Sequence, residues 1–278
     1  MSKTWFVTGA SSGIGAGVVK AALEAGDRVV ATARNVEKLE AAIGQPASDR
    51  LVFVALDVTK EDQAQQAIAA AVAKFGRIDV LVNNAGYSVI GNFESLTTKQ
   101  FQEQLDTNFY GVLHVMRAAL PVMRRQGSGR IFNVSSTAGV MGWATCAAYA
   151  ASKFAVEGLS LSVAQEVEKF GIKVTLVEPG FFRTDLLAPQ SVVFGEVAVD
   201  GYDAPAAVKA TWQGYHHTQG GDPAKLGTAI VKLAAMASPP KQFLAGSDAV
   251  EGLTSDLKTR LNEVEANKAL SKSTDGNF

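Results

Sequence analysis

Short apolar runs alternate with longer segments in which apolar residues recur every three or four positions along this chain of 278 residues. The apolar runs predict strands, and the longer segments predict helices. Strands are expected near 4–8, 28–33, 51–56, 78–82, 129–134 and 172–178. Helices are expected near 14–25, 35–43, 60–75, 98–124 and 148–169, with a bend or a new start at Pro121. This alternation predicts an α/β fold with a doubly wound parallel sheet and helices on both faces.

A glycine-rich turn joins the first expected strand to the first expected helix. Glycine permits positive φ and a close approach to the backbone, and the N–H groups that open a helix attract an anion. The pattern therefore favours a dinucleotide pyrophosphate site over a simple tight connection, although its spacing is G-x-x-x-G-x-G and not G-x-G-x-x-G. The residues of the turn are Gly9, Ser11, Ser12, Gly13, Ile14 and Gly15.

A second group of polar residues precedes and enters the helix expected at 148–169. Tyr149 and Lys153 are four residues apart and share one helix face, and the Ser135-Ser136 pair precedes them. We expect the Lys153 ammonium to favour the phenolate and to lower the pKa of Tyr149 from about 10, which suits a general acid or base. Taken alone, this spacing is also compatible with a half-buried tyrosine beside a solvated lysine.

The chain carries further motifs in a fixed order after the glycine turn. They are Asp57-Val58, Asn83-Asn84-Ala85-Gly86, Asn108, Ser136, Tyr149, Lys153 and the run from Pro179 to Thr184. With these motifs, residues 3 to about 190 resemble the compact, single-domain branch of the short-chain dehydrogenase/reductase family. The resemblance implies a Rossmann-type domain over 1–278 whose ligands bind beyond the carboxyl ends of the strands.

The resemblance also implies a reaction and a role for each catalytic residue. The reaction is reversible hydride transfer between NADP(H) and a ketone, an aldehyde or a secondary alcohol. Tyr149 exchanges the proton, Ser136 orients the substrate oxygen, and Lys153 lowers the tyrosine pKa and holds the nicotinamide ribose. Asn108 is expected to hold a water that connects Lys153 to solvent, with a local helix bend as the alternative. The thirteen-residue step to Tyr149 selects Ser136 over Ser135.

The end of the second strand bears on the choice of cofactor. Ala33 stands where relatives that use NAD carry aspartate, and Arg34 follows with a guanidinium suited to bidentate phosphate binding. This favours NADP(H), with NAD(H) as the alternative, since the glycine turn lacks an extra basic residue. Arg34 is also compatible with an ordinary surface turn.

The remaining cofactor positions follow from the resemblance. Asp57 and Val58 are expected at the adenine, although an aspartate at this point also starts helices. Asn84, Ala85 and Gly86 are expected beside the nicotinamide ribose, with part of their role structural. Pro179, Gly180, Phe182 and Thr184 are expected at the nicotinamide end of the cofactor. Thr184 is expected to bind the nicotinamide carboxamide.

Residues 181–222 mix aromatic, glycine, proline and polar residues, which predicts a mobile substrate lid. The aromatic residues indicate either a pocket for a bulky or aryl ketone or the packing of the lid itself. Met141 and Trp143, before the tyrosine, are further pocket candidates. The lid candidates are Phe182, Leu186, Leu187, Phe194, Tyr202, Trp212, Tyr215 and His216.

Composition narrows the classes of function. A net charge of −1 without a basic run argues against nucleic acid as a partner. The one cysteine, Cys146, excludes an internal disulfide. It is expected to be a buried, non-catalytic thiol and is a candidate for the wall of the pocket. His216 and His217 are expected to point apart, and we expect no metal site. The strand that starts by residue 4 and the lack of a long apolar run predict a cytoplasmic protein without a signal peptide or membrane segment.

The chain continues beyond the resemblance in a charged, helix-like tail at about 247–278. We expect a homo-oligomer, a dimer or tetramer, of undetermined order. Two enzymatic alternatives are an NAD-dependent alcohol dehydrogenase and an enoyl reductase. A dinucleotide-sensing protein without activity is a third, but it would have little need of Asn108, Ser136, Tyr149 and Lys153 together.

Overall fold

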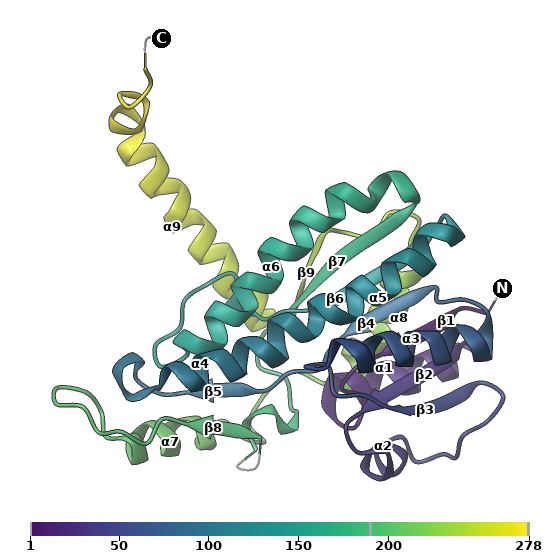
Figure 1. Cartoon of the computed structure of the whole chain (residues 1–278). Coiled ribbons are helices and arrows are strands. Elements are labelled where there is room, and N and C mark those ends of the chain that lie inside the picture. Colours follow the sequence, from purple (N-terminus) through teal and green to yellow (C-terminus); the bar gives the residue numbers. More distant parts are fainter. Residues whose placement is uncertain (1, 189–190, 277–278) are drawn as a thin grey trace.

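The computed structural model describes residues 2–188 and 191–276. At its centre is a seven-stranded parallel sheet with the order β3-β2-β1-β4-β6-β7-β9 (Figure 1). From β1 the chain adds β2 and β3 on one side of the sheet, and from β4 onward it adds strands on the other side. The strand order therefore reverses between β1 and β4, and such sheets bind ligands at this switch point. The strands are β1 (Thr4–Val7), β2 (Arg28–Ala33), β3 (Leu51–Ala55), β4 (Val80–Asn83), β6 (Gly129–Val134), β7 (Ile172–Pro179) and β9 (Gln242–Ala245).

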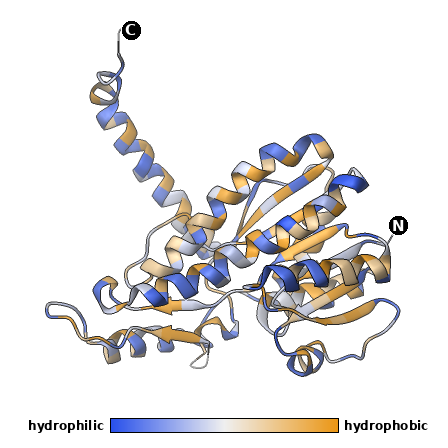
Figure 2. Ribbon diagram, in the orientation of Figure 1, coloured by the Kyte–Doolittle hydropathy of each residue, from blue (hydrophilic) through white to orange (hydrophobic). Residues whose placement is uncertain are grey.

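Helices cover both faces of the sheet, which confirms the expected doubly wound fold (Figure 1). In β1, Trp5 and Val7 pack into one layer and Phe6 packs into the other, because successive side chains of a strand point to opposite faces. One layer contains α1 (Gly13–Glu24), α2 (Val36–Ile43) and α8 (Pro223–Ala235). The other contains α3 (Glu61–Phe75), α5 (Gly111–Gln126) and α6 (Ala147–Val167). The strands are mostly apolar, as Figure 2 shows.

The helix expected over 98–124 is interrupted, but not at the expected position. It consists of α4 (Thr98–Leu105), a π-helical turn at Asp106–Tyr110, and α5. Pro121 lies inside α5 and starts no new helix. The irregularity instead surrounds Asn108, and π turns often occur at functional sites.

The segment between β7 and α8 forms a layer beside the carboxyl ends of the strands. This segment contains β8 (Val192–Phe194) and α7 (Pro205–Gly214), and β8 pairs with β5 (Ser88–Ile90), which follows β4. None of these three elements was expected from the sequence. The last helix, α9 (Ser247–Lys272), extends away from the rest of the chain (Figure 1). Single 3-10 turns lie at Phe93–Ser95, Thr137–Gly139, Glu168–Phe170 and Asp185–Leu187.

Candidate active site

The glycine turn lies between β1 and α1 and packs tightly against the end of β4. Gly9 and Gly13 have positive φ angles of 62° and 52°. A Cβ atom on Gly9 would lie 2.7 Å from the Ala85 Cα, and one on Gly15 would lie 2.5 Å from the Asn84 Nδ2. The Asn84 amide donates to the carbonyls of Thr8 and Gly9 at 3.1 and 3.0 Å. Asn84 therefore fixes the turn, and glycine is required there for both conformation and space.

The start of α1 fits the pyrophosphate of a nicotinamide dinucleotide. Ser12 precedes the helix in extended conformation without a side-chain cap, and the first turn contains no acidic residue. The first N–H groups and the positive end of the helix dipole are thus available to an anion. Ser11 and Ile14 belong to this turn, and a Cβ atom on Gly13 would lie 3.0 Å from the Thr184 side chain. The structure thereby brings Thr184 to the same edge.

Two of the expected cofactor positions follow β2 and β3. Ala33 is buried at the end of β2, and Arg34 follows with an exposed side chain. Arg34 forms no ion pair within residues 2–188 and 191–276, so its guanidinium is available to a phosphate. The Asp57 carboxylate accepts hydrogen bonds from the backbone N–H and the hydroxyl of Thr59 at 3.0 and 2.8 Å. Asp57 therefore closes a turn ahead of α3, whose N-cap is Lys60, and does not itself start the helix. Val58 is buried against Gly111.

The ends of β6 and α6 bring the serine, tyrosine and lysine together. Ser136 precedes the turn at Thr137–Gly139, and its hydroxyl accepts from the Ala138 N–H at 3.1 Å. Tyr149 lies in the first turn of α6 and borders the same pocket as Ser136. The Lys153 ammonium lies 5.7 Å from the centre of the Tyr149 ring and donates to the Val134 carbonyl at 2.8 Å.

The pKa of Tyr149 differs from the expectation. Burial raises it to about 12, and the Ser136 hydroxyl only partly opposes the rise. Burial also lowers the pKa of Lys153 to about 8, with the carboxylate of Glu157 opposing. The expected lowering by Lys153 is wrong for this structure, because its ammonium bonds to a backbone carbonyl and both groups lie where charge is poorly solvated. At neutral pH, Tyr149 therefore holds its proton.

Asn108 lies in the π turn behind this group and is almost fully buried. Its Oδ1 accepts from the Tyr87 N–H, and its Nδ2 donates to the Tyr87 carbonyl and to the Ser152 hydroxyl, each at 3.1 Å. A Cβ atom on Gly86 would lie 3.0 Å from the Asn108 Oδ1 and 3.8 Å from the Lys153 Nζ. The structure thus places Asn108, Gly86 and Lys153 in one small region, and the helix is distorted there as well.

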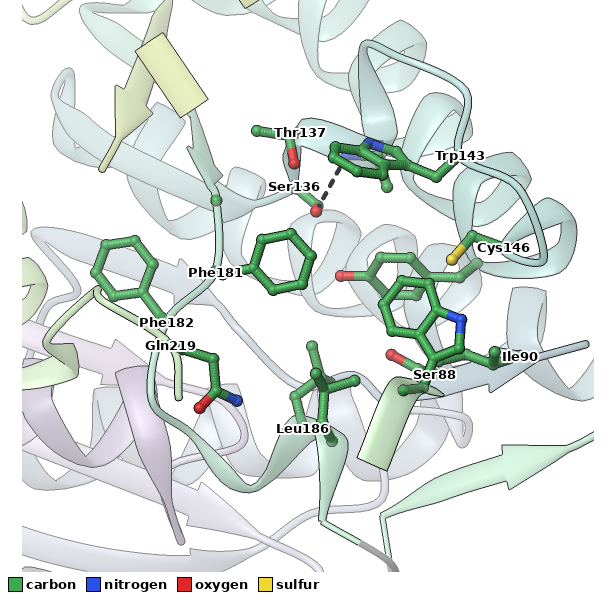
Figure 3. Close-up of a pocket in the computed structure, with 15 residues that line it drawn as sticks. Ser88, Ile90, Ser136, Thr137, Trp143, Cys146, Phe181, Phe182, Leu186 and Gln219 are labelled. Atoms are coloured by element: carbon green, nitrogen blue, oxygen red, sulfur yellow. Dashed lines mark hydrogen bonds between the residues drawn. The ribbon is translucent and has the colours of Figure 1, made fainter. Parts of the chain in front are cut away.

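A pocket opens in front of Tyr149, with a volume of about 580 Å³ that includes its open mouth. Figure 3 shows the Phe181 ring between Ser136 and Leu186, with Trp143 and Cys146 at the side. The described residues that border this pocket include no charged side chain, which suits a neutral organic substrate. The residues around it are Ser88, Ile90, Ser136, Thr137, Ala138, Trp143, Cys146, Tyr149, Gly180, Phe181, Phe182, Leu186, Leu187, Trp212 and Gln219.

Some of the expected lid residues border the pocket and others do not. Phe182, Leu186, Leu187 and Trp212 border it, together with Trp143. Tyr215 packs against Phe181 from outside at 5.5 Å, and Tyr202 donates to Glu94. The remaining candidates, Phe194, His216 and Met141, lie elsewhere, with Met141 close to Gly252 of α9.

Several residues that border the pocket were not predicted from the sequence. Ser88 and Ile90 come from the unexpected strand β5, and Gln219 follows α7. Gln219 is buried, and its Oε1 has no hydrogen-bond partner among the described residues, so it can accept a bond from a substrate. The nearest sequence signal is its place inside 181–222, which does not distinguish it from its polar neighbours.

The adjacent histidines and the cysteine provide neither a metal site nor a nucleophile among the described residues. The ring centres of His216 and His217 lie 3.8 Å apart, so the expectation that they point apart is wrong. His217 has φ of 67°, which folds the backbone back and brings the rings together. Residues 2–188 and 191–276 contain no group of three or more His, Cys, Asp or Glu arranged to hold a metal. Burial raises the pKa of the Cys146 thiol to about 12, so it is not a nucleophile at neutral pH.

Two buried acids lie behind the catalytic lysine. Glu157 follows Lys153 by one helical turn and is 6% exposed, and Glu178 of β7 is fully buried. Glu178 accepts from Gln242 at 2.9 Å, whereas both carboxyl oxygens of Glu157 lack a partner in the described chain. Burial and the neighbouring Glu178 raise the pKa of Glu157 to about 7, with Ser135, Lys153 and Gln242 only partly opposing the rise.

Among the described residues, no helix combines the length and the apolar character that a membrane crossing requires.

Comparison with known proteins agrees with this site. The family model described as short chain dehydrogenase matches residues 3–192. Oxidoreductase BOA17 of Botryotinia fuckeliana is 40% identical over 254 residues, which cover 90% of this chain and 91% of that protein. The crystal structure of a short-chain dehydrogenase from Streptomyces avermitilis is 38% identical, with a TM-score of 0.89 over 99% of this chain and 100% of that one. ElxO, determined with NADP bound, is 30% identical, with a TM-score of 0.74 over 90% and 100% of the two chains. The chain is therefore an oxidoreductase of the short-chain dehydrogenase family.

Proposed function

We propose that this protein is an NADP-dependent carbonyl reductase that acts on a bulky, uncharged ketone or aldehyde. The observation that carries the proposal is the pocket itself, since Ser136 and Tyr149 place two hydroxyls against a space otherwise bordered mainly by apolar and aromatic side chains. A carbonyl oxygen needs such donors, and an aryl or alkyl group needs such walls.

Each residue of the site has a role in this reaction. Ser136 and Tyr149 hold the carbonyl oxygen, and Tyr149 donates its proton to that oxygen as negative charge develops on it. Lys153 and Asn108 hold a water-linked route that returns a proton to Tyr149. NADPH, when bound, supplies the hydride that adds to the carbonyl carbon. Gly9 to Gly15, Asn84 to Gly86, Pro179, Gly180, Phe182 and Thr184 would hold the cofactor.

The pKa of Tyr149 favours the rate of reduction over the rate of oxidation at neutral pH. Reduction requires the protonated phenol, and a pKa of about 12 keeps that form dominant at neutral pH. Alcohol oxidation requires the phenolate, which is scarce under the same conditions. We therefore place the alcohol dehydrogenase second.

The segment 181–222 would act as the substrate lid of a single domain. Phe181 connects it to the pocket, since its ring lies 6.0 Å from Trp143 and 6.4 Å from Trp212. The Trp212 indole donates to Thr145 at 2.8 Å and fixes α7 to the loop before Tyr149. These contacts join the lid to the catalytic helix.

The direct test is the loss of nicotinamide absorbance when the protein meets a panel of aryl ketones, keto esters and aldehydes. NADPH and NADH are compared in parallel, and an enone tests carbon–carbon reduction. Turnover of ketones with NADPH supports the proposal. Turnover confined to the enone, or binding of NADPH without turnover of any compound, contradicts it.

Arg34→Ala is expected to weaken NADPH binding. Loss of a charge-assisted phosphate contact should raise the KM for NADPH by about tenfold to a hundredfold and leave the KM for NADH within about twofold. Steady-state kinetics with both cofactors measure this change. Lys38→Ala, which removes an exposed cation from the neighbouring helix α2, is the matched control. Equal effects of Arg34→Ala on both cofactors would show that Arg34 does not read the phosphate.

Trp212→Ala is expected to weaken the binding of aryl ketones. Trp212 supplies an apolar wall of the pocket, so its truncation should raise the KM for an aryl ketone by about tenfold, while a small aldehyde changes less. The comparison of KM between the two substrates measures the effect. Tyr215→Ala removes a ring that packs outside the pocket and serves as the control. An equal rise for both substrates would indicate general damage to the lid.

A further inference from the structure

The outer part of α9 carries an apolar stripe that no described residue covers. The helix is anchored at its start, where Ala249 and Leu253 are buried, and then extends away from the rest of the chain (Figure 1). Four apolar side chains along the helix are exposed by about half or more, Val250, Leu257, Leu261 and Val264, at 48, 54, 61 and 62%, and Leu270, at 70%, lies on the other side of the helix. Figure 2 shows apolar positions recurring among hydrophilic ones along this helix.

These four residues lie on one side of α9. Val250, Leu257 and Val264 follow one another at intervals of seven, and Leu261 lies between the last two. Intervals of seven, divided into four and three, form the narrow seam by which two helices pair. Val250, Leu257 and Val264 occupy one seam position, and Leu261 occupies the other, with Thr254 and Lys268 one heptad to either side. Arg260 faces the chain's own Val140 carbonyl instead, so the stripe lies to the side of the anchored face.

The charges beside the stripe alternate in sign with the same period. Glu251, Lys258 and Glu265 directly follow Val250, Leu257 and Val264, and Lys272 continues the same interval of seven. In an antiparallel pair of identical helices, these flanking positions of the two copies face each other. Their alternation therefore determines which alignments attract.

Only one antiparallel alignment near the middle of the stripe brings opposite charges together. In it, Lys258 faces Glu265 of the second copy, Glu251 faces Lys272, and both pairs occur twice by symmetry. A shift by one heptad in one direction brings Lys258 against Lys258, and a shift in the other brings Glu265 against Glu265. A parallel pair would instead face this flank with the other flank of the second copy, Leu253, Arg260 and Asn267, whose one charge, Arg260, is already bound to Asp256 of its own helix at 2.6 Å.

We propose that two copies of this chain pair through α9 as an antiparallel coiled coil in the alignment that faces Lys258 with Glu265. In this alignment Leu261 packs against Val264 of the other copy, and Leu257 packs beneath the methylene stem of Lys268. The two copies then lie at opposite ends of the helix pair, so α9 extends from the chain to reach its partner. This contact is independent of the catalytic reaction.

A disulfide cross-link tests both the pairing and its direction. Leu261→Cys and Val264→Cys are purified together from cells that express both variants with different tags, and then oxidised. The antiparallel pair should form the mixed cross-link at least about fivefold more than either variant alone, because these two positions face each other only across the antiparallel seam. The native chain is the blank, since Cys146 is buried. Strong self-linking of Leu261→Cys, or no cross-link, overturns the proposal.

Charge reversal tests the alignment by sedimentation of the full chain. Lys258→Glu should weaken association through α9 by about tenfold, since two attractive pairs become repulsive. Lys258→Glu with Glu265→Lys should recover most of it, although Glu265 also pairs with Lys268 of its own helix at 3.0 Å. Glu263→Lys changes the charge on the opposite side and is the control. A native chain that stays at its monomer mass of 29.2 kDa, or a double variant no better than the single one, contradicts the proposed pair.

Discussion

Replacing Tyr149 with phenylalanine is expected to lower the rate of ketone reduction by about 1000-fold. The ring keeps its place in α6, but the hydroxyl that donates the proton is lost, and a positioned general acid contributes about 100- to 10,000-fold. The loss corresponds to about 4 kcal/mol of transition-state stabilisation. Single-turnover kinetics with saturating NADPH measure it directly.

The test of Tyr149 needs two controls. Tyr110→Phe removes a hydroxyl from an exposed tyrosine of the π turn and should leave the rate unchanged. Quenching of protein fluorescence by NADPH should show that Tyr149→Phe still binds the cofactor. If the variant retains more than about a tenth of the native rate with normal binding, another group donates the proton and the proposed mechanism is wrong.

The central sheet could be predicted because its strands are buried on both faces. Because neither face of such a strand contacts solvent, runs such as Val80-Leu81-Val82 are apolar at every position and can be recognised in the sequence. The strand β9 could not be predicted in this way, because it has only four residues and begins with the exposed Gln242. The helix α8 did have a signal, because Asp222 caps it and Pro223 starts it.

The polar site was predictable where residues share a strand end or a helix face. Parallel strands end at one edge of the sheet, and this brings Ser136 and Asn84 toward the glycine turn. Gln219 could not be predicted, because its position depends on how a long irregular segment folds over that edge. The raised pKa of Tyr149 could not be predicted either. The helical spacing places Lys153 near Tyr149, but it does not show that the ammonium donates its hydrogen bond to the Val134 carbonyl.

The pair of buried acids behind the catalytic lysine could not be inferred either, although Glu157 belongs to the same helix face as Lys153. A glutamate four residues after a lysine predicts an ordinary ion pair on an exposed helix. The Glu157 carboxyl is instead buried and unpartnered in the described chain, with Glu178 across from it. Burial therefore destabilises the ionised form of Glu157 more than the Lys153 ammonium stabilises it.

Glu157→Gln is consequently expected to stabilise the protein at alkaline pH by about 3 kcal/mol. The pKa of Glu157 is raised from 4.5 to about 7, so the folded state holds this proton more tightly than the unfolded chain does. Its contribution to stability is full below pH 4.5, declines as the pH rises to about 7, and is lost above that. The rise corresponds to about 3 kcal/mol, and glutamine retains the neutral form throughout.

Guanidinium unfolding at pH 4.5 and pH 8.5, at one protein concentration, measures this difference. The variant and the native chain should differ by less than about 0.5 kcal/mol at pH 4.5, because Glu157 is then protonated in the folded state and about half protonated in the unfolded chain. At pH 8.5 the variant should be more stable, since only the native chain must bury a carboxylate beside Glu178. Glu166→Gln removes an exposed acid from the same helix and should change neither value by more than about 0.5 kcal/mol. A variant less stable than the native chain at pH 8.5 would mean that attraction to Lys153 exceeds the desolvation of Glu157, and that the two form a true buried ion pair.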